Sequence, residues 1–196
     1  MQYSTFAAID IGSYDVILEI FEISKKQGIR SVDKICHRME LGKDTYTLGK
    51  IRPEMEEELC RVLADFVRIM EGYRVDDYRA TASSAISEAS NSLYVLGKIH
   101  QLTGFSVTVL SNSEQRFLSY KALAAMEDNF NKIIEKGTAI LDLDGGSFQI
   151  SLFDKDALVT TQNIRMGSLR IRERLAGIQS ETEHYEEMVE ELIWNE

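Results

Sequence analysis

Two short segments combine aspartate, glycine and serine in the same order, and each follows a run of apolar residues. They are Asp10-Ile-Gly-Ser13 and Asp142-Leu-Asp-Gly-Gly-Ser147, termed the first and the second glycine turn. Glycine lets backbone N–H groups approach a ligand closely, and successive N–H groups in a turn can bind an anion. Carboxylate oxygens are ligands that Mg²⁺ prefers. The two turns therefore predict a site for a chain of phosphates with a divalent cation.

The same residue types are common in ordinary hairpin turns, so a single copy would favour a purely structural interpretation. A second copy at an equivalent place in the chain favours a shared ligand. From Ser13 and from Ser147 the chain continues in a similar way, as Ser-Tyr-Asp-Val and as Ser-Phe-Gln-Ile. We therefore expect Asp10 and Asp142 to lie close together across one cleft, beneath the two turns.

The elements that must position these turns follow from hydrophobic periodicity. Apolar patterns predict strands at 6–11, 15–23, 31–41, 78–82 and 105–110. Three further strands are predicted: one from 139, one that resumes directly after the second glycine turn, and one near 157–164. Helical spacing predicts helices at 53–72, with Pro53 in the first turn, and at 84–102, 112–129, 168–175 and 182–194. Strands separated by helices imply parallel pairing through right-handed crossovers.

The element order restarts after Gly137, which predicts a duplicated lobe. We expect a first lobe at 1–130, in the order β-β-β-α-β-α-β-α, and the start of a second lobe at 131–196. The second copy has no strand after its last helices. An incomplete lobe leaves a sheet edge and an apolar face uncovered, so we expect a trimmed chain or a gene fragment. We expect it to self-associate through the exposed face, for example as a homodimer.

Composition and charge narrow the functional classes. The chain has 196 residues, is 44% hydrophobic and carries a formal net charge of −10, which disfavours a general nucleic-acid binder. It has no apolar run of about 18 residues and no visible signal peptide, so we expect no membrane span. Cys36 and Cys60 form no CxxC pair, which argues against a zinc site. These features predict a cytoplasmic protein.

Six segments in order resemble the exopolyphosphatase/guanosine pentaphosphate phosphohydrolase (Ppx/GppA) family of the actin/Hsp70/sugar-kinase superfold. They are AAIDIGS, MELGK, RATASSAISEASN, TVLSNSEQR, ILDLDGGSFQI and RMGSLRIRERL. The resemblance implies an α/β, ribonuclease H-like or actin-like ATPase fold, with a mixed sheet and helices on both faces. It also implies hydrolysis of the terminal phosphoanhydride in polyphosphate or in guanosine penta- or tetraphosphate, with Mg²⁺ or another divalent cation.

The resemblance implies roles for individual residues. Glu114 matches the family glutamate that orients or deprotonates the attacking water, and Asp10 and Asp142 match loop aspartates that would hold the metal. The matching phosphate-binding residues are Gly12, Ser13, Gly145, Gly146, Ser147 and Arg170. Glu114 also has a structural alternative, because Ser111-Asn-Ser-Glu114 has the spacing of a capping box. Spacing alone favours the cap, whereas the resemblance favours the catalytic role.

The chain departs from the family pattern at several positions. Asp144 stands for a glycine, Phe148 for a threonine, Gln149 for a glutamate, Tyr14-Asp15 for Asn-Ser, and Ser87 for an arginine. An arginine makes bidentate bonds to phosphate that a serine cannot replace. Asp144 could act as a metal ligand or repel a phosphate. Two alternatives to an active hydrolase therefore stay open: a degenerate protein that binds a nucleotide or phosphate chain without hydrolysis and, less favoured, an ATP-dependent kinase or ATPase.

Overall fold

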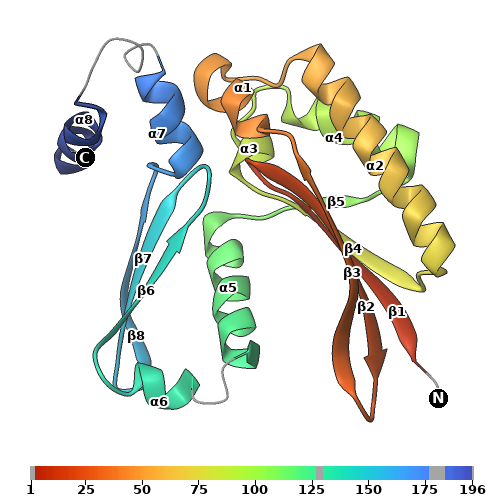
Figure 1. The fold of residues 1–196 in the computed structure, drawn as a ribbon, viewed down its shortest axis with the longest axis horizontal. Coiled ribbons are helices and arrows are strands. Elements are labelled where there is room, and N and C mark those ends of the chain that lie inside the picture. Colours follow the sequence, from red (N-terminus) through yellow and green to blue (C-terminus); the bar gives the residue numbers. More distant parts are fainter. Residues whose placement is uncertain (1–2, 127–129, 177–183, 196) are drawn as a thin grey trace. The chain divides into compact units, whose positions relative to one another are not determined.

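The computed structural model describes residues 3–126, 130–176 and 184–195. The chain forms two compact units, Met1–Ser111 and Asn112–Glu196 (Figure 1). Helix α5 (Asn112–Met126), which the expected boundary at 130/131 assigns to the first lobe, belongs to the second unit.

A mixed five-stranded sheet forms the centre of the first unit, in the order β3-β2-β1-β4-β5. Its strands are β1 (Ser4–Ile11), β2 (Asp15–Ser24), β3 (Gly28–Arg38), β4 (Asp77–Ala82) and β5 (Val107–Val109). The first three strands pair antiparallel, whereas β4 and β5 are parallel to β1. The first glycine turn therefore connects two neighbouring central strands.

The core of the first unit lies on one face of this sheet. Ala7, Ile9 and Ile11 alternate along β1 and are fully buried, and each is paired in register with a buried residue of β2. Helices α2 (Pro53–Tyr73) and α4 (Ser92–Thr103) supply further residues to the same core. Apolar residues at helical spacing bury one stripe of α2, as the sequence predicted. The buried faces of the strands and of the helices thus pack together in a single hydrophobic layer.

The structure corrects two sequence predictions in the first unit. The strand expected to reach Leu41 ends at Arg38, and helix α1 (Leu41–Leu48) follows it. Glu40, directly before α1, has a left-handed backbone with φ of 55°, which an extended strand cannot accommodate. The helix expected at 84–102 is divided into α3 (Ser84–Ser87) and α4. Both differences place additional polar side chains near the first glycine turn.

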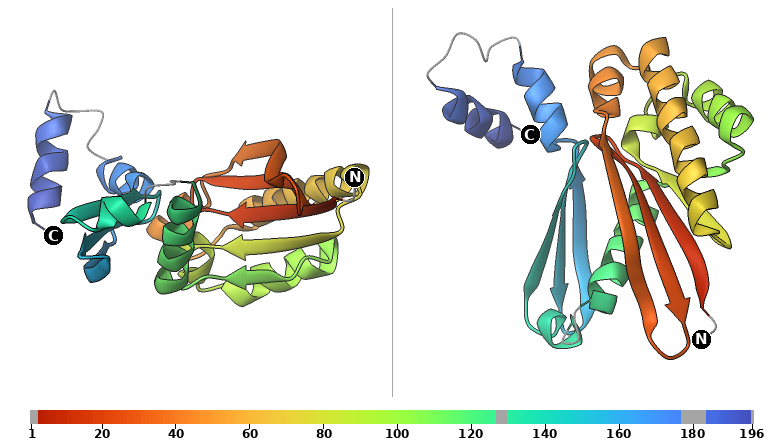
Figure 2. Two further views of the ribbon diagram at one scale, coloured as in Figure 1. Left: turned by 90° about the horizontal axis from the view of Figure 1, so that it is seen from below. Right: turned by 45° about the vertical axis from the view of Figure 1, so that its right-hand side comes forward.

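The second unit contains a three-stranded antiparallel sheet in the order β6-β7-β8 (Figure 2). Its strands are β6 (Thr138–Leu143), β7 (Phe148–Asp154) and β8 (Ala157–Ile164), and its helices are α5, α6 (Phe130–Ile134), α7 (Ser168–Leu175) and α8 (Tyr185–Trp194). Tyr120 of α5 packs edge-on against Phe153 of β7, with ring centroids 5.2 Å apart. Helix α6 was not predicted. Residues 127–129 and 182–183 of the expected helices lie outside the described residues.

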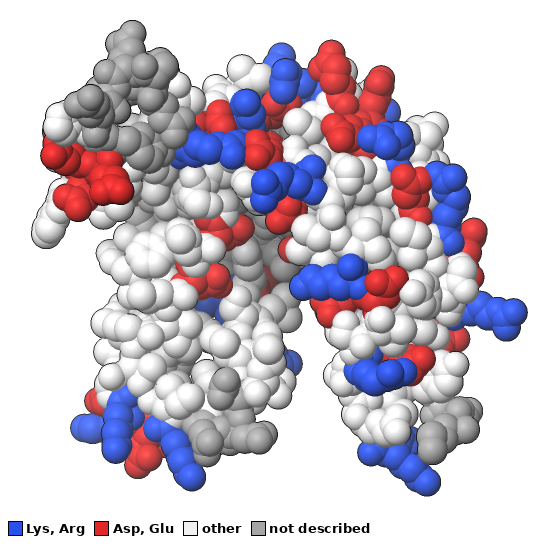
Figure 3. All heavy atoms as spheres, in the orientation of Figure 1, with Lys and Arg blue, Asp and Glu red and all other residues white. Residues whose placement is uncertain are grey.

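Charge is mixed on the face drawn in Figure 3, where Lys and Arg are interspersed with Asp and Glu rather than gathered into one stripe. Within the described ranges, none of the helices combines the length and the apolar character that crossing a bilayer requires.

Candidate functional site

The first glycine turn brings the chain back on itself within a very small space. The N–H of Gly12 donates to the carbonyl oxygen of Asp15 at 3.0 Å. A Cβ at Gly12 would lie 2.9 Å from that oxygen, so only glycine allows the close approach. The Asp10 carboxylate lies beside the turn, since its Oδ2 is 3.8 Å from the same Cβ position. The turn therefore holds an exposed aspartate next to a tightly folded backbone.

Ser13 does not point its hydroxyl to the surface. It is fully buried, and its Oγ is hydrogen-bonded to the Tyr46 hydroxyl at 2.6 Å and to Ser84 Oγ at 3.2 Å. The Tyr46 and Ser84 hydroxyls are also 2.8 Å apart. Three hydroxyl groups from the turn, α1 and α3 thus form a closed cluster. The phosphate-binding role expected for Ser13 stays a prediction. In the structure, its hydroxyl stabilises the turn through these hydrogen bonds.

Backbone contacts also tie α1 to the first glycine turn. Gly42 N–H donates to the Ser13 carbonyl at 2.8 Å, and the N–H groups of Met39 and Glu40 both donate to the Tyr14 carbonyl. These bonds join residues 25 to 29 positions apart. Local sequence patterns did not reveal Tyr46 or Ser84 as neighbours of the turn, because nothing nearby in the chain specifies these contacts.

Ser83 is a further residue that sequence reasoning missed. It lies between β4 and α3, is 5% exposed, and its N–H donates to the Ile11 carbonyl at 3.2 Å. Its hydroxyl has no hydrogen-bond partner among the described residues. A buried hydroxyl without a partner is costly, so its position beside the turn suggests a group that completes its bonding with a ligand.

The second glycine turn is fixed to the start of α7 through its carbonyl groups. The N–H of Ser168 donates to the Asp144 carbonyl at 3.0 Å, and the N–H groups of Leu169 and Arg170 donate to the Gly145 carbonyl at 3.1 Å. The Nε of Arg170 donates to the Gly146 carbonyl at 3.0 Å. Arg170 therefore holds the turn in place, and its predicted contact with phosphate stays a prediction.

Gly167 makes this attachment possible. A Cβ at this position would lie 2.4 Å from the Asp144 carbonyl oxygen and from the carbonyl carbon and oxygen of Gly145. All of these are backbone atoms, so a side chain would force the turn and the helix apart. Gly167 is not among the residues predicted for the site. A glycine directly before a helix is the signal that could have drawn attention to it.

The N–H groups of the second turn are used differently from its carbonyls. The N–H of Asp144 donates to the Ser147 carbonyl at 2.9 Å, and the N–H of Gly145 donates to the Asp144 side chain, with Oδ1 at 2.6 Å. In the part of the chain that the structure describes, the N–H groups of Gly146 and Ser147 have no hydrogen-bond acceptor. The carbonyl groups of residues 144–147 thus all accept hydrogen bonds, whereas two N–H groups of the turn have no acceptor among the described residues.

Asp142 begins this turn and lines a cavity of about 200 Å³ between α5 and the sheet, together with apolar and polar side chains. Its Oδ2 accepts a hydrogen bond from Ser119 Oγ at 3.0 Å. Gln149, its partner in the β6–β7 register, lines the same cavity and is 8% exposed. Tyr120 and Ser151, hydrogen-bonded to each other, complete the polar lining. The neutral amide of Gln149 therefore stands directly beside the predicted metal ligand.

Glu114 is exposed in the first turn of α5, and Ser111 directly precedes that helix. The two residues occupy the positions that the capping-box alternative requires, at the N-cap and at the third helical residue. Ser87 is also exposed, at the end of α3.

Asp10 and Asp142 are compatible with Mg²⁺, because carboxylate oxygens are hard donors. Within the described residues no three His, Cys, Asp or Glu side chains gather in a group that could hold a metal ion. Mg²⁺ commonly uses only one or two carboxylates together with water and substrate phosphates. The donor set therefore fits an ion that arrives with a phosphate ligand. The expectation that both aspartates share one cleft stays a prediction, since they belong to different units.

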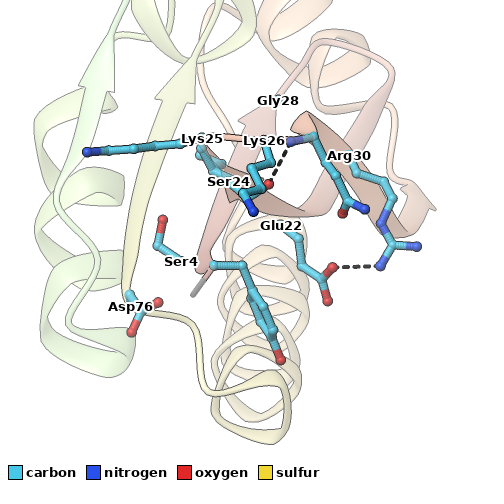
Figure 4. Close-up of a pocket in the computed structure, with 11 residues that line it drawn as sticks. Ser4, Glu22, Ser24, Lys25, Lys26, Gly28, Arg30 and Asp76 are labelled. Carbon is cyan, nitrogen blue, oxygen red and sulfur yellow. Dashed lines mark hydrogen bonds and ion pairs between the residues drawn. The ribbon is translucent and has the colours of Figure 1, made fainter. Parts of the chain in front are cut away.

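A larger cavity, of about 1110 Å³, lies at the other end of β1 from the first glycine turn (Figure 4). It is lined by Tyr3, Ser4, Asp76 and the β2–β3 hairpin, including Lys25 and Lys26. Arg30 is ion-paired with Glu22 at 2.6 Å on this wall. The cavity contains none of the predicted site residues, so its size does not identify it as the reaction site.

Comparison with known proteins identifies a protein family that this chain matches. The sequence profile of the Ppx/GppA phosphatase family matches residues 19–195. The chain is 25% identical to exopolyphosphatase 1 of Mycobacterium leprae over 144 residues, which are 73% of this chain and 41% of that protein. It is 22% identical to the bifunctional 3-dehydroquinate synthase/phosphatase of Fusobacterium nucleatum, over 86% of this chain and 26% of that protein.

The fold is also found among solved structures. An exopolyphosphatase from Cytophaga hutchinsonii superimposes with a TM-score of 0.76 at 22% identity, covering 87% of this chain and 53% of that one. The expected actin-like α/β fold is thereby confirmed. The chain spans about half the length of this structure and less of the two curated relatives.

Proposed function

Because this chain belongs to the Ppx/GppA phosphatase family, we propose that the protein is a hydrolase that releases the terminal phosphate of polyphosphate or of guanosine penta- or tetraphosphate. The relatives named exopolyphosphatase support polyphosphate as the first substrate to test. We propose Mg²⁺ as the cofactor.

One observation carries the proposal: the backbone polarity of the second glycine turn. All of the carbonyl groups of residues 144–146 accept hydrogen bonds from α7, whereas the N–H groups of Gly146 and Ser147 have no acceptor among the described residues. A phosphate oxygen offers the acceptor that these donors lack, and glycine lets it approach them. The turn is therefore suited to an anion and is already held in shape before an anion arrives.

The remaining roles follow from side-chain chemistry. Asp10 and Asp142 would hold Mg²⁺, which when bound neutralises phosphate charge. Ser119 would keep the Asp142 carboxylate in place through its hydrogen bond. Glu114 would orient the attacking water and accept its proton. Phosphoryl transfer depends mainly on positioning and charge stabilisation, so such a set of groups is sufficient.

A second candidate function, a protein that binds phosphate chains without hydrolysing them, is favoured by Gln149. This buried amide faces the same cavity as Asp142, so the local carboxylate charge is smaller than a glutamate there would provide. A weaker metal site would lower turnover more than binding. Gln149→Glu should therefore raise Mg²⁺ affinity, and in an active hydrolase it should also raise turnover.

The test is phosphate release from polyphosphate, guanosine pentaphosphate and ATP, each with and without Mg²⁺, by the intact protein. Mg²⁺-dependent release from either of the first two substrates supports the proposal. Release from ATP alone would instead support the ATPase alternative. Binding of polyphosphate without release of phosphate, by both the parent and Gln149→Glu, would establish the non-hydrolysing function.

A further inference from the structure

The side chain of Asp144 occupies a donor of the second glycine turn that a phosphate would otherwise use. Its Oδ1 lies 2.6 Å from the Gly145 nitrogen, within the same turn that leaves Gly146 and Ser147 without acceptors. An N–H group that donates to a carboxylate makes the same kind of charge-assisted bond that it would make to a phosphate oxygen. The turn therefore already contains an anion, supplied by its own chain.

The fold does not need this contact to keep the turn in shape. Three backbone N–H groups of α7 and the Nε of Arg170 hold the carbonyl side of the turn, and the Asp144 N–H closes it through the Ser147 carbonyl. Gly167 permits this close backbone packing. The carboxylate adds one hydrogen bond to a turn that at least five others already fix. Its main effect is consequently electrostatic.

We propose that Asp144 is an internal competitor for the phosphate chain: the ligand must displace its carboxylate from Gly145 or bind beside its negative charge. This inference rests on the proposed function, because it concerns the affinity of the same turn. Either route weakens binding. A unit charge about 5 Å from a single phosphate charge lowers affinity by about fourfold at the permittivity of water, and by more at the lower effective permittivity near a protein surface. Asp144 would thus restrict the turn to ligands that bring a cation or several phosphates.

Two substitutions separate charge from hydrogen bonding. Asp144→Asn keeps an oxygen that can accept the Gly145 N–H but removes the charge, whereas Asp144→Gly removes both. Asp154→Asn is the matched control, since it makes the same charge change in the same unit at the far end of β7. The probe is inorganic tripolyphosphate, titrated calorimetrically into the intact protein at fixed ionic strength, with and without Mg²⁺.

We expect Asp144→Asn and Asp144→Gly to bind tripolyphosphate at least about fourfold more tightly than the parent, and Asp154→Asn to bind like the parent. Equal affinity of the parent and Asp144→Asn would overturn the internal competitor while leaving the proposed function intact. Weaker binding by Asp144→Asn only when Mg²⁺ is present would identify Asp144 as a metal ligand and also overturn it. Absence of binding by the parent and both variants would overturn the phosphate site itself.

Discussion

Gly167→Ala should separate the second glycine turn from α7. The new Cβ would lie 2.4 Å from backbone atoms of Asp144 and Gly145, about 1 Å closer than ordinary contact, so the two segments must move apart. The hydrogen bonds from Ser168, Leu169 and Arg170 would then exceed bonding distance. At about 0.5–1.5 kcal/mol for each of these three bonds, the second unit should lose about 1.5–4.5 kcal/mol of stability.

The assay combines urea unfolding with tripolyphosphate titration, because the same displacement should also weaken anion binding. Gly97→Ala is the matched control. A Cβ at Gly97, inside α4, meets no atom within 4 Å, so alanine there should stabilise the protein by up to about 1 kcal/mol. If the Gly167→Ala variant had the same free energy of unfolding as the parent and bound tripolyphosphate with the same affinity, the close packing of turn and helix would not be what organises the site.

Three further outcomes are expected. Glu114→Gln should lower turnover by about 10²–10⁴-fold with little change in substrate binding, whereas a purely capping Glu114 would give unchanged turnover and a loss of about 1 kcal/mol in stability. Ser83→Ala should leave stability unchanged or slightly raised, because it removes a buried hydroxyl that has no partner in the described chain. It should also weaken tripolyphosphate binding measurably. Ser84→Ala, the neighbouring control, should lower stability because it removes the hydrogen bonds to Ser13 and Tyr46. Lys98→Met should destabilise the protein, because it leaves the buried Glu56 carboxylate, 2.6 Å from the Lys98 ammonium, without its cation. The hydrogen bond to Glu56 raises the pKa of Lys98 above its usual 10.5. The loss in free energy of unfolding relative to the parent should therefore be complete at neutral pH and become smaller only as the pH rises beyond that value.

The helices and strands that the sequence predicted correctly are those with a strong hydrophobic periodicity. Helix α2 begins at Pro53 and buries apolar residues at helical spacing, and α7 occupies Ser168–Leu175 as expected. These elements depend on interactions between residues three or four positions apart, which the local sequence contains.

The division of the helix expected at 84–102 has a tertiary cause. The Asn91 side chain accepts the Ile51 N–H at 3.0 Å and donates to the Ile51 carbonyl at 2.8 Å, while Ser90 N–H donates to the Gly49 carbonyl. This paired docking of two loops holds residues 88–91 out of a helix. Its partner lies 40 positions away, so no local pattern could indicate it.

The sequence by itself determined the two Asp-Gly-Ser turns, the strands that carry them and the resemblance to a phosphatase family, because each depends on residue type and short spacing. Only the tertiary structure decided how the polar groups of those turns are used. It buried Ser13 against Tyr46 and Ser84, turned the carbonyls of the second glycine turn toward α7, and placed the Asp144 carboxylate on Gly145 N–H. A hydrogen-bond donor becomes available or occupied through the groups that folding brings beside it, and several of these groups are distant in sequence.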